Sequence, residues 1–255
     1  MNKLLLKHCI RLPLACTLLS GIAVLPSISH AQNTQFTSDQ QKEIVSVVRQ
    51  ALKDDPSILE DAIVSAQKQM AQERNEQASK TLTEKKNLLT SILPSDGFIG
   101  QPDAKNVIVE FYDPRCPYCK KVLPELIQLT KEDKNVKIIF KVVPILGENS
   151  ILQAKAIAAA ARQNGYVAMM KGLMDSKLNI DEETIKTIAK AQHLDPDRLL
   201  QDMKASSISK ALDDNVELLK QLGIEGTPAL IVNENKIVPG AVSYQTLKTL
   251  IQNNQ

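Results

Sequence analysis

Two cysteines separated by two residues are the part of this sequence best suited to do chemistry. Cys116 and Cys119 lie in the segment Arg115-Cys116-Pro117-Tyr118-Cys119-Lys120, shortly after the apolar run 107–112. On the first turn of a helix such a pair can close into a disulfide, and free N–H groups and the helix dipole there stabilise a thiolate. A position at a helix start lowers the pKa of a thiol from about 8.5 to roughly 3.5 to 7.5. The spacing predicts a thiol-disulfide exchange site, with Cys116 as the nucleophile and Cys119 as the less exposed resolving thiol.

A static disulfide and half of a zinc site are the other uses of such a pair. A structural zinc ion needs about four ligands, whereas the chain after residue 31 holds only these two cysteines and one histidine, His193. We therefore expect no bound metal and no organic cofactor. The redox-active disulfide Cys116–Cys119 would be the only reactive group that the chemistry needs.

The N-terminal residues have the pattern of an export signal. Residues 1–31 carry three basic side chains and no acidic one, then an apolar stretch, and end in the small-x-small sequence Ser29-His30-Ala31. This pattern predicts a signal peptide cleaved before Gln32. The apolar stretch is too short for a comfortable membrane span, and Cys16 leaves a lipid anchor as an alternative.

Composition after cleavage excludes some partners. Removing 31 of the 255 residues leaves 224, and the 31 basic residues fall to 28 against 29 acidic ones. A nearly neutral chain gives no reason to expect nucleic-acid binding. The length suffices for one medium domain with an appendage.

The segment 32–95 is predicted to be helical. Residues 36–93 contain no glycine and one proline, and their apolar residues recur at helical spacing. A helix is predicted to begin near Ser38, and a second, longer one to begin after the break at Asp54-Asp55-Pro56-Ser57.

The apolar stripe of these helices needs a partner surface, because two helices cannot bury it against themselves. The stripe ends near Met70 and is followed by the polar stretch 72–86. We expect a homo-oligomer, a trimer or a dimer, through residues 36–92, with the polar stretch as an arm crossing solvent. Packing of the stripe on the rest of the same chain is the alternative.

Strands and helices alternate in residues 96–255. The expected elements are parallel strands at 107–112 and 136–143, a helix from Cys116, an all-helical insertion at about 147–223, strands at 229–232 and 236–238, and a helix from Ser243. This order predicts an α/β fold with buried strands.

Several of these residues resemble a known family. Val109-Glu110-Phe111-Tyr112-Asp113-Pro114-Arg115-Cys116-Pro117-Tyr118-Cys119, followed much later by Gly226-Thr227-Pro228-Ala229, is similar to the thioredoxin fold of the DsbA family. The resemblance covers roughly residues 96–253. With the helical N-terminal extension, the chain resembles the ScsC group (suppressor of copper sensitivity) and the Com1-like exported proteins. The resemblance implies a thioredoxin fold with a helical insertion, preceded by an oligomerisation extension.

The resemblance also implies roles for residues outside the cysteine pair. Pro228 would be a cis-proline beside the active site, preceded by Thr227, and their extended backbone would pair with a substrate strand. The Thr227 hydroxyl would hydrogen-bond an active-site sulfur. A threonine at this position is more typical of disulfide isomerases than of DsbA oxidases. Glu110 would be a buried acid with a raised pKa that exchanges protons with Cys119. An ordinary glutamate facing a sheet edge is the alternative for Glu110.

The expected activity follows from these residues and the resemblance. Pro117 and Tyr118 stand between the cysteines without the histidine of the strongest oxidases, which indicates a less oxidising site. We expect a periplasmic disulfide isomerase that acts on cysteine-containing exported proteins and exchanges electrons with a membrane redox partner. A DsbA-like dithiol oxidase, a copper(I)-binding protein that uses the same thiols and a structural protein with an incidental cysteine pair are the alternatives.

Overall fold

The computed structural model describes residues 36–252, so the predicted signal peptide at 1–31 lies outside the described residues. The chain divides into two compact units, one ending at Leu59 and the other beginning at Glu60. The first unit holds helix α1 (Ser38–Asp54) and the start of helix α2 (Ser57–Thr90). Both helices begin close to where the sequence predicts them.

Helix α1 is capped at its first turn but buries none of its side chains. The Thr37 hydroxyl accepts from the Gln40 backbone N–H, and the Gln40 side chain accepts from the Thr37 N–H, a capping box that satisfies two otherwise unpaired donors. Ile44, Val45 and Val48 are 43%, 54% and 51% exposed. The part of the predicted apolar stripe on α1 is therefore exposed in the described structure, and oligomerisation through the stripe stays a prediction.

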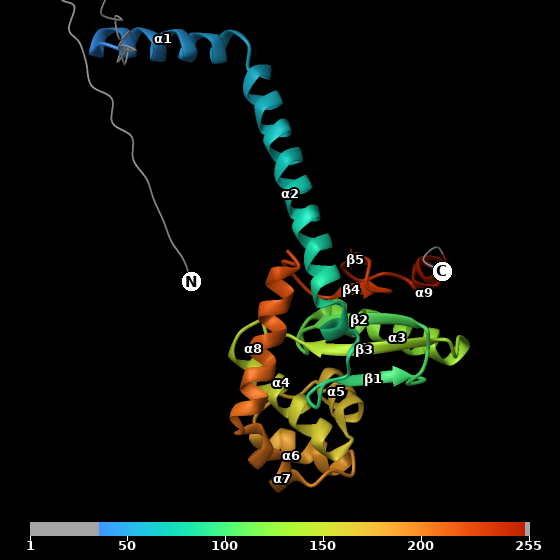
Figure 1. Ribbon diagram of the computed structural model, residues 1–255. Coiled ribbons are helices and arrows are strands. Elements are labelled where there is room, and N and C mark those ends of the chain that lie inside the picture. The colour runs from blue at the N-terminus through green and yellow to red at the C-terminus, as the bar shows by residue number, and fades with distance from the viewer. Residues whose placement is uncertain (1–35, 253–255) are drawn as a thin grey trace, which may run out of the picture. The chain divides into compact units, whose positions relative to one another are not determined.

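The second unit is built on a five-stranded sheet in the order β1-β3-β2-β4-β5 (Figure 1). The strands are β1 (Gly97–Gly100), β2 (Asn106–Tyr112), β3 (Val136–Val142), β4 (Ala229–Val232) and β5 (Lys236–Pro239). β2 and β3 are parallel, as predicted, and the other neighbouring pairs are antiparallel. β1 was not predicted, because a four-residue strand with glycine at both ends has too few apolar residues for a strand pattern.

Helices fill the rest of the unit and confirm the predicted insertion. They are α3 (Pro117–Glu132), α4 (Glu148–Ala160), the short 3₁₀ turn Ala161–Gln163, α5 (Tyr166–Asp175), α6 (Glu182–Ala191), α7 (Pro196–Met203), α8 (Ser206–Gln221) and α9 (Tyr244–Gln252). Helices α4 to α8 lie between β3 and β4 in the sequence, and α5 packs beside β1 (Figure 1). No helix among residues 36–252 is long and apolar enough to cross a membrane.

The sheet buries both of its faces, so its central strand is apolar almost throughout. Side chains alternate between faces along a strand. Ile108 and Tyr112 of β2 join the core that contains α3 and the helical insertion, whereas Val107, Val109 and Phe111 join a core on the other face. Glu110 shares the face of Ile108 and Tyr112 by this alternation, which places it on the side of the cysteines.

The polar stretch 72–86 does not cross solvent along its whole length, and this expectation was wrong. Leu82 and Leu89 of α2 are 5% and 0% exposed and complete the second core, where α8 also packs. The Thr81 hydroxyl donates to the Gln221 carbonyl at 3.1 Å. The composition of the stretch hid one narrow apolar face, and residues 60–95 therefore belong to the compact unit of the sheet rather than to a separate segment ending at 95.

A buried ion pair fixes the connection between α2 and β1. The Lys141 ammonium contacts Asp96 Oδ2 at 2.7 Å, with the two side chains 0% and 1% exposed. Asp96 Oδ2 also accepts from the Leu93 backbone N–H at 3.0 Å. Neither buried charge is solvated by water, so separating the two would leave each unpaired at a high cost. The pair therefore fixes Asp96, just before β1, to Lys141 of β3.

Candidate active site

The cysteine pair begins helix α3, as the spacing predicts. Cys116 is the N-cap residue with extended backbone angles, Pro117 is the first helical residue, and Cys119 lies in the first turn. Proline suits the first helical position because it has no N–H to leave unpaired and its φ angle is already helical. Both thiols are free in this structure.

Cys116 lies against the loop that precedes β4. Its Sγ donates to the Thr227 carbonyl oxygen at 3.2 Å, and the Thr227–Pro228 peptide bond is cis. The structure thus confirms the expected cis-proline and brings it to the cysteine pair. The contact with the sulfur is made by the backbone carbonyl of Thr227, whereas the resemblance suggested the side-chain hydroxyl.

The two thiols differ in burial in the expected order. Cys116 is 4% exposed and Cys119 is 0% exposed, so Cys116 is the more accessible thiol but is itself mostly covered. Burial raises the pKa of the Cys119 thiol, and the negative charge of Glu110 raises it further, while a backbone hydrogen bond from Asp113 acts in the opposite direction. Cys119 is therefore a neutral thiol at neutral pH, which suits a resolving cysteine that must first lose its proton.

Glu110 is a buried acid in the central strand, and the edge-facing alternative is wrong. Its neighbours in the sheet are Phe140 on β3 and Leu230 on β4, and it is 2% exposed. Burial raises its pKa from 4.5 to about 8, and the charge of Cys116 adds to the rise. Glu110 Oε1 has no hydrogen-bond partner in the described part of the chain. A carboxyl with such a pKa can both hold and release a proton near neutral pH.

Asp113 anchors the loop before Cys116, a role that was not predicted for it. One carboxylate oxygen accepts from the Arg115 N–H and the Ser150 hydroxyl, both at 2.8 Å. The other accepts from the backbone N–H groups of Ile145 and Leu146 at 2.9 and 3.0 Å. The signal for its role was present, because an aspartate directly after a strand often caps the turn that follows.

Two buried tyrosines, Tyr112 and Tyr166, lie near Glu110. Neither was predicted to contribute to the site. The Tyr112 hydroxyl donates to the Tyr166 hydroxyl at 2.9 Å, and Tyr166 donates to the Phe140 carbonyl at 3.3 Å. Burial raises the pKa of both phenols. They remain neutral and add no charge to the site. Tyr166 comes from the helical insertion, so sequence spacing could not have paired it with Tyr112.

Two surface clefts meet at Thr227. One encloses about 420 Å³ and is lined by Tyr118 and Lys121 of α3 together with residues 240–243. The other encloses about 460 Å³ and is lined by residues 222–228 together with Arg74 and other residues of α2. Thr227, whose carbonyl accepts from the Cys116 thiol, lines both clefts. The described residues contain no group of three or more His, Cys, Asp or Glu side chains that would hold a metal ion.

Comparisons with known proteins agree with this geometry. A family model described as thioredoxin matches residues 92–253. A linker-deletion mutant of Proteus mirabilis ScsC is 30% identical with a TM-score of 0.62, and the match covers 87% of this chain and 97% of that one. A periplasmic thioredoxin-like protein from Salmonella enterica serovar Typhimurium is 27% identical with a TM-score of 0.59, covering 66% and 94% of the two chains.

A curated relative is named for disulfide bond formation. The probable disulfide bond formation protein D of Bacillus anthracis is 27% identical over 169 residues, which are 60% of this chain and 75% of the relative. The match to the family model, the ScsC relative and the cysteine pair at the start of α3 lead to one assignment. The chain belongs to the thioredoxin family and is a thioredoxin-fold thiol-disulfide oxidoreductase of the ScsC and DsbA-like type.

Proposed function

We propose that this protein is a periplasmic disulfide isomerase that acts on cysteine-containing exported proteins. The observation that carries the proposal is the arrangement around Cys116. Its sulfur lies 3.2 Å from the carbonyl of Thr227, where two clefts meet. Cys119 and Glu110 are both buried, and their charges interact with each other and with Cys116. Export is inferred from the predicted signal peptide and from the likeness to a periplasmic relative.

The reaction begins with attack of the Cys116 thiolate on one sulfur of a wrong substrate disulfide. The substrate S–S bond breaks, a mixed disulfide forms, and the second substrate sulfur leaves as a thiolate. That thiolate attacks another disulfide of the substrate. A later substrate thiolate then displaces Cys116, so the bonds are rearranged with no net transfer of electrons.

Cys119 releases the substrate from the mixed disulfide when rearrangement fails. It loses its proton and attacks the Cys116 sulfur, which releases reduced substrate and leaves the Cys116–Cys119 disulfide. Two electrons pass to the substrate in this branch, so an electron donor must restore the dithiol. We infer a membrane redox partner for that role. Glu110 accepts the Cys119 proton, because its pKa of about 8 leaves a fraction of carboxylate available at neutral pH.

Assembly through residues 36–92 would support isomerisation. Phe36, Val47 and Met70 are 59%, 64% and 60% exposed, and an apolar surface of this kind on helices is suited to a second or third copy of the chain. Several active sites in one assembly raise the effective concentration of thiols around a bound substrate.

A pair of assays tests the proposed activity. The reduced protein should restore activity to a scrambled multi-disulfide enzyme, and should oxidise a fully reduced substrate only slowly. Fast oxidation with no recovery of the scrambled enzyme would assign a DsbA-like oxidase instead.

Titration of the reduced protein with copper(I) tests the metal-binding alternative. Tight binding that is lost in the Cys116→Ser variant would favour it.

Light scattering on the chain without residues 1–31 tests the assembly, and a monomeric mass would contradict it. Deletion of residues 32–59 should then yield a monomer that keeps the dithiol chemistry but loses most isomerase activity. The deletion should stop there, because removing α2 entirely would uncover the core that Leu82 and Leu89 complete. Each of these side chains contributes about 1.5–3 kcal/mol by burial.

A further inference from the structure

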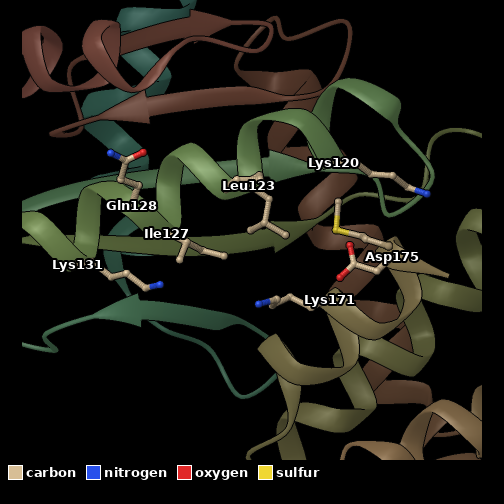
Figure 2. Close-up of a pocket in the computed structure, with 9 residues that line it drawn as sticks. Lys120, Leu123, Ile127, Gln128, Lys131, Lys171 and Asp175 are labelled. Carbon is tan, nitrogen blue, oxygen red and sulfur yellow. The ribbon is translucent and has the colours of Figure 1, made fainter.

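A third cleft runs along helix α3, on a face different from that of the Thr227 cleft lined by Tyr118 and Lys121. It encloses about 440 Å³ between α3 and α5 (Figure 2). At about 100° per residue, Tyr118 and Lys121, which line the cleft at Thr227, face away from Leu123 and Ile127, which line this one. The established chemistry gives this third cleft no role.

The floor of the α3–α5 cleft is apolar and its rim is cationic. Leu123 and Met174 are 6% and 4% exposed, and Ile127 is half-buried beside them. Three lysines line the cleft, with Asp175 as the one acidic residue among the lining side chains. The remaining lining residues are Pro124 and Gln128, and the lysines are Lys120, Lys131 and Lys171.

The lysines of the rim are free to bind an external anion. Within residues 36–252, no salt bridge joins any of the three to an acidic side chain. Figure 2 shows the side chains of Lys131 and Lys171 extending toward each other across the cleft, one from α3 and one from α5. Two ammonium groups that converge above an apolar floor attract a ligand that is acidic and apolar at once.

The length of the cleft matches an extended peptide. Lys120 and Lys131 are eleven positions apart on α3, which is about 17 Å at 1.5 Å per residue. A chain of about five residues at 3.3 Å each spans that distance. Lys120 also directly follows Cys119, so the cleft begins beside the active site, within reach of a protein bound to Cys116 by a mixed disulfide.

We propose that the α3–α5 cleft binds an extended protein segment in which apolar and acidic residues alternate. The inference rests on the proposed function, because it assumes that Cys116 reacts with other proteins. Apolar side chains of the segment lie on Leu123, Ile127 and Met174, and its carboxylates meet Lys131 and Lys171. A substrate held in this way stays near Cys116 while its sulfurs rearrange.

A cysteine-free peptide tests the cleft without any disulfide chemistry. The probe is a fluorescent peptide with the core Glu-Leu-Glu-Leu-Glu, and the comparison peptide has Lys-Leu-Lys-Leu-Lys. Fluorescence anisotropy with the chain lacking residues 1–31 should show binding of the acidic peptide only. The double variant Lys131→Glu/Lys171→Glu should weaken that binding at least tenfold. Higher salt should weaken the binding to the unaltered protein, because exposed charges are screened.

Matched controls separate the cleft from a general charge effect. Lys134→Glu changes an exposed lysine outside the cleft and should leave binding unchanged. Reduction of a small aromatic disulfide by the double variant should be normal, which shows that the fold and the cysteine pair are intact. Equal binding of both peptides, or binding unchanged in the double variant, would overturn the proposal. Binding of decanoate in place of the peptide would also overturn it and assign a small amphiphile.

The outcomes also separate this inference from the proposed function. Normal peptide binding with no recovery of a scrambled enzyme would leave the cleft standing and remove the isomerase assignment. Recovery of the scrambled enzyme with peptide binding unchanged in the double variant would do the opposite.

Discussion

Replacing Glu110 by glutamine should make the protein more stable and the redox site slower. The amide has nearly the shape of the carboxyl but carries no charge at any pH. The wild-type carboxyl has a pKa of 4.5 when exposed and about 8 when buried in the fold. The folded state therefore binds the proton more tightly than the unfolded state, and its stability falls as pH rises from about 4.5 to about 8.

The size of the effect follows from these two pKa values. One pKa unit corresponds to 1.36 kcal/mol, so burying the carboxyl costs about 1 kcal/mol at pH 5, about 3 kcal/mol at pH 7 and about 4 kcal/mol at pH 8. The glutamine variant avoids this growing cost. The free-energy difference between variant and wild type should therefore increase by about 3 kcal/mol from pH 5 to pH 8.

Urea denaturation of both proteins at pH 5 and pH 8, under reducing conditions, measures this difference. Burial, the main cause of the raised Cys119 pKa, is the same in both proteins, so Cys119 stays protonated in both across this pH range. The exposed residue Glu76 on α2 provides the control variant Glu76→Gln, which should leave the pH dependence of wild type unchanged. A constant stability difference between Glu110→Gln and wild type across this range would refute the reasoning.

The same variant should slow the chemistry of Cys119. Glutamine cannot take up the proton that Cys119 must lose before it attacks. Resolution of a mixed disulfide should slow by roughly 10²-fold, the lower range for a general base. Rapid-quench trapping of the mixed disulfide measures its lifetime, and an unchanged lifetime would remove Glu110 from the mechanism.

Three further outcomes follow from the site and the core. Cys116→Ser should abolish insulin reduction, whereas Cys119→Ser should still form a mixed disulfide that gel electrophoresis detects without reductant; activity surviving in the first variant would reverse the roles. Asp113→Asn should lower the urea midpoint by the equivalent of about 2–4 kcal/mol, because an amide nitrogen would face donors that now bond to a carboxylate; an unchanged midpoint would contradict this. Lys141→Met should cost about 3–5 kcal/mol by leaving Asp96 buried and unpaired, and adding Asp96→Leu should recover most of the loss. A double variant as unstable as the single one would show that the pair is not the cause.

The local chemistry of the site could be predicted from the sequence. The Cys-x-x-Cys spacing with proline after the first cysteine places both thiols at a helix start, because caps and helix turns depend on residues three or four positions apart. The burial of Glu110 was expected only from the family resemblance, because an acid within the apolar run 107–112 could by itself equally have faced a sheet edge. The period of apolar residues located α1, α2 and the main strands.

The tertiary structure decided what lies around those residues. Thr227 is 111 residues from Cys116, and only the closing of β4 against β2 places its carbonyl on the sulfur. The packing of Leu82 and Leu89 against the sheet was hidden because α2 is polar on average while its contacts depend on one narrow face. The cationic cleft likewise exists only because α3 and α5, separated by a strand and a helix, present their lysines to one space. Periodicity in a sequence records which side of an element is apolar, but the choice of the element that covers that side is made by the long-range contacts of the folded chain.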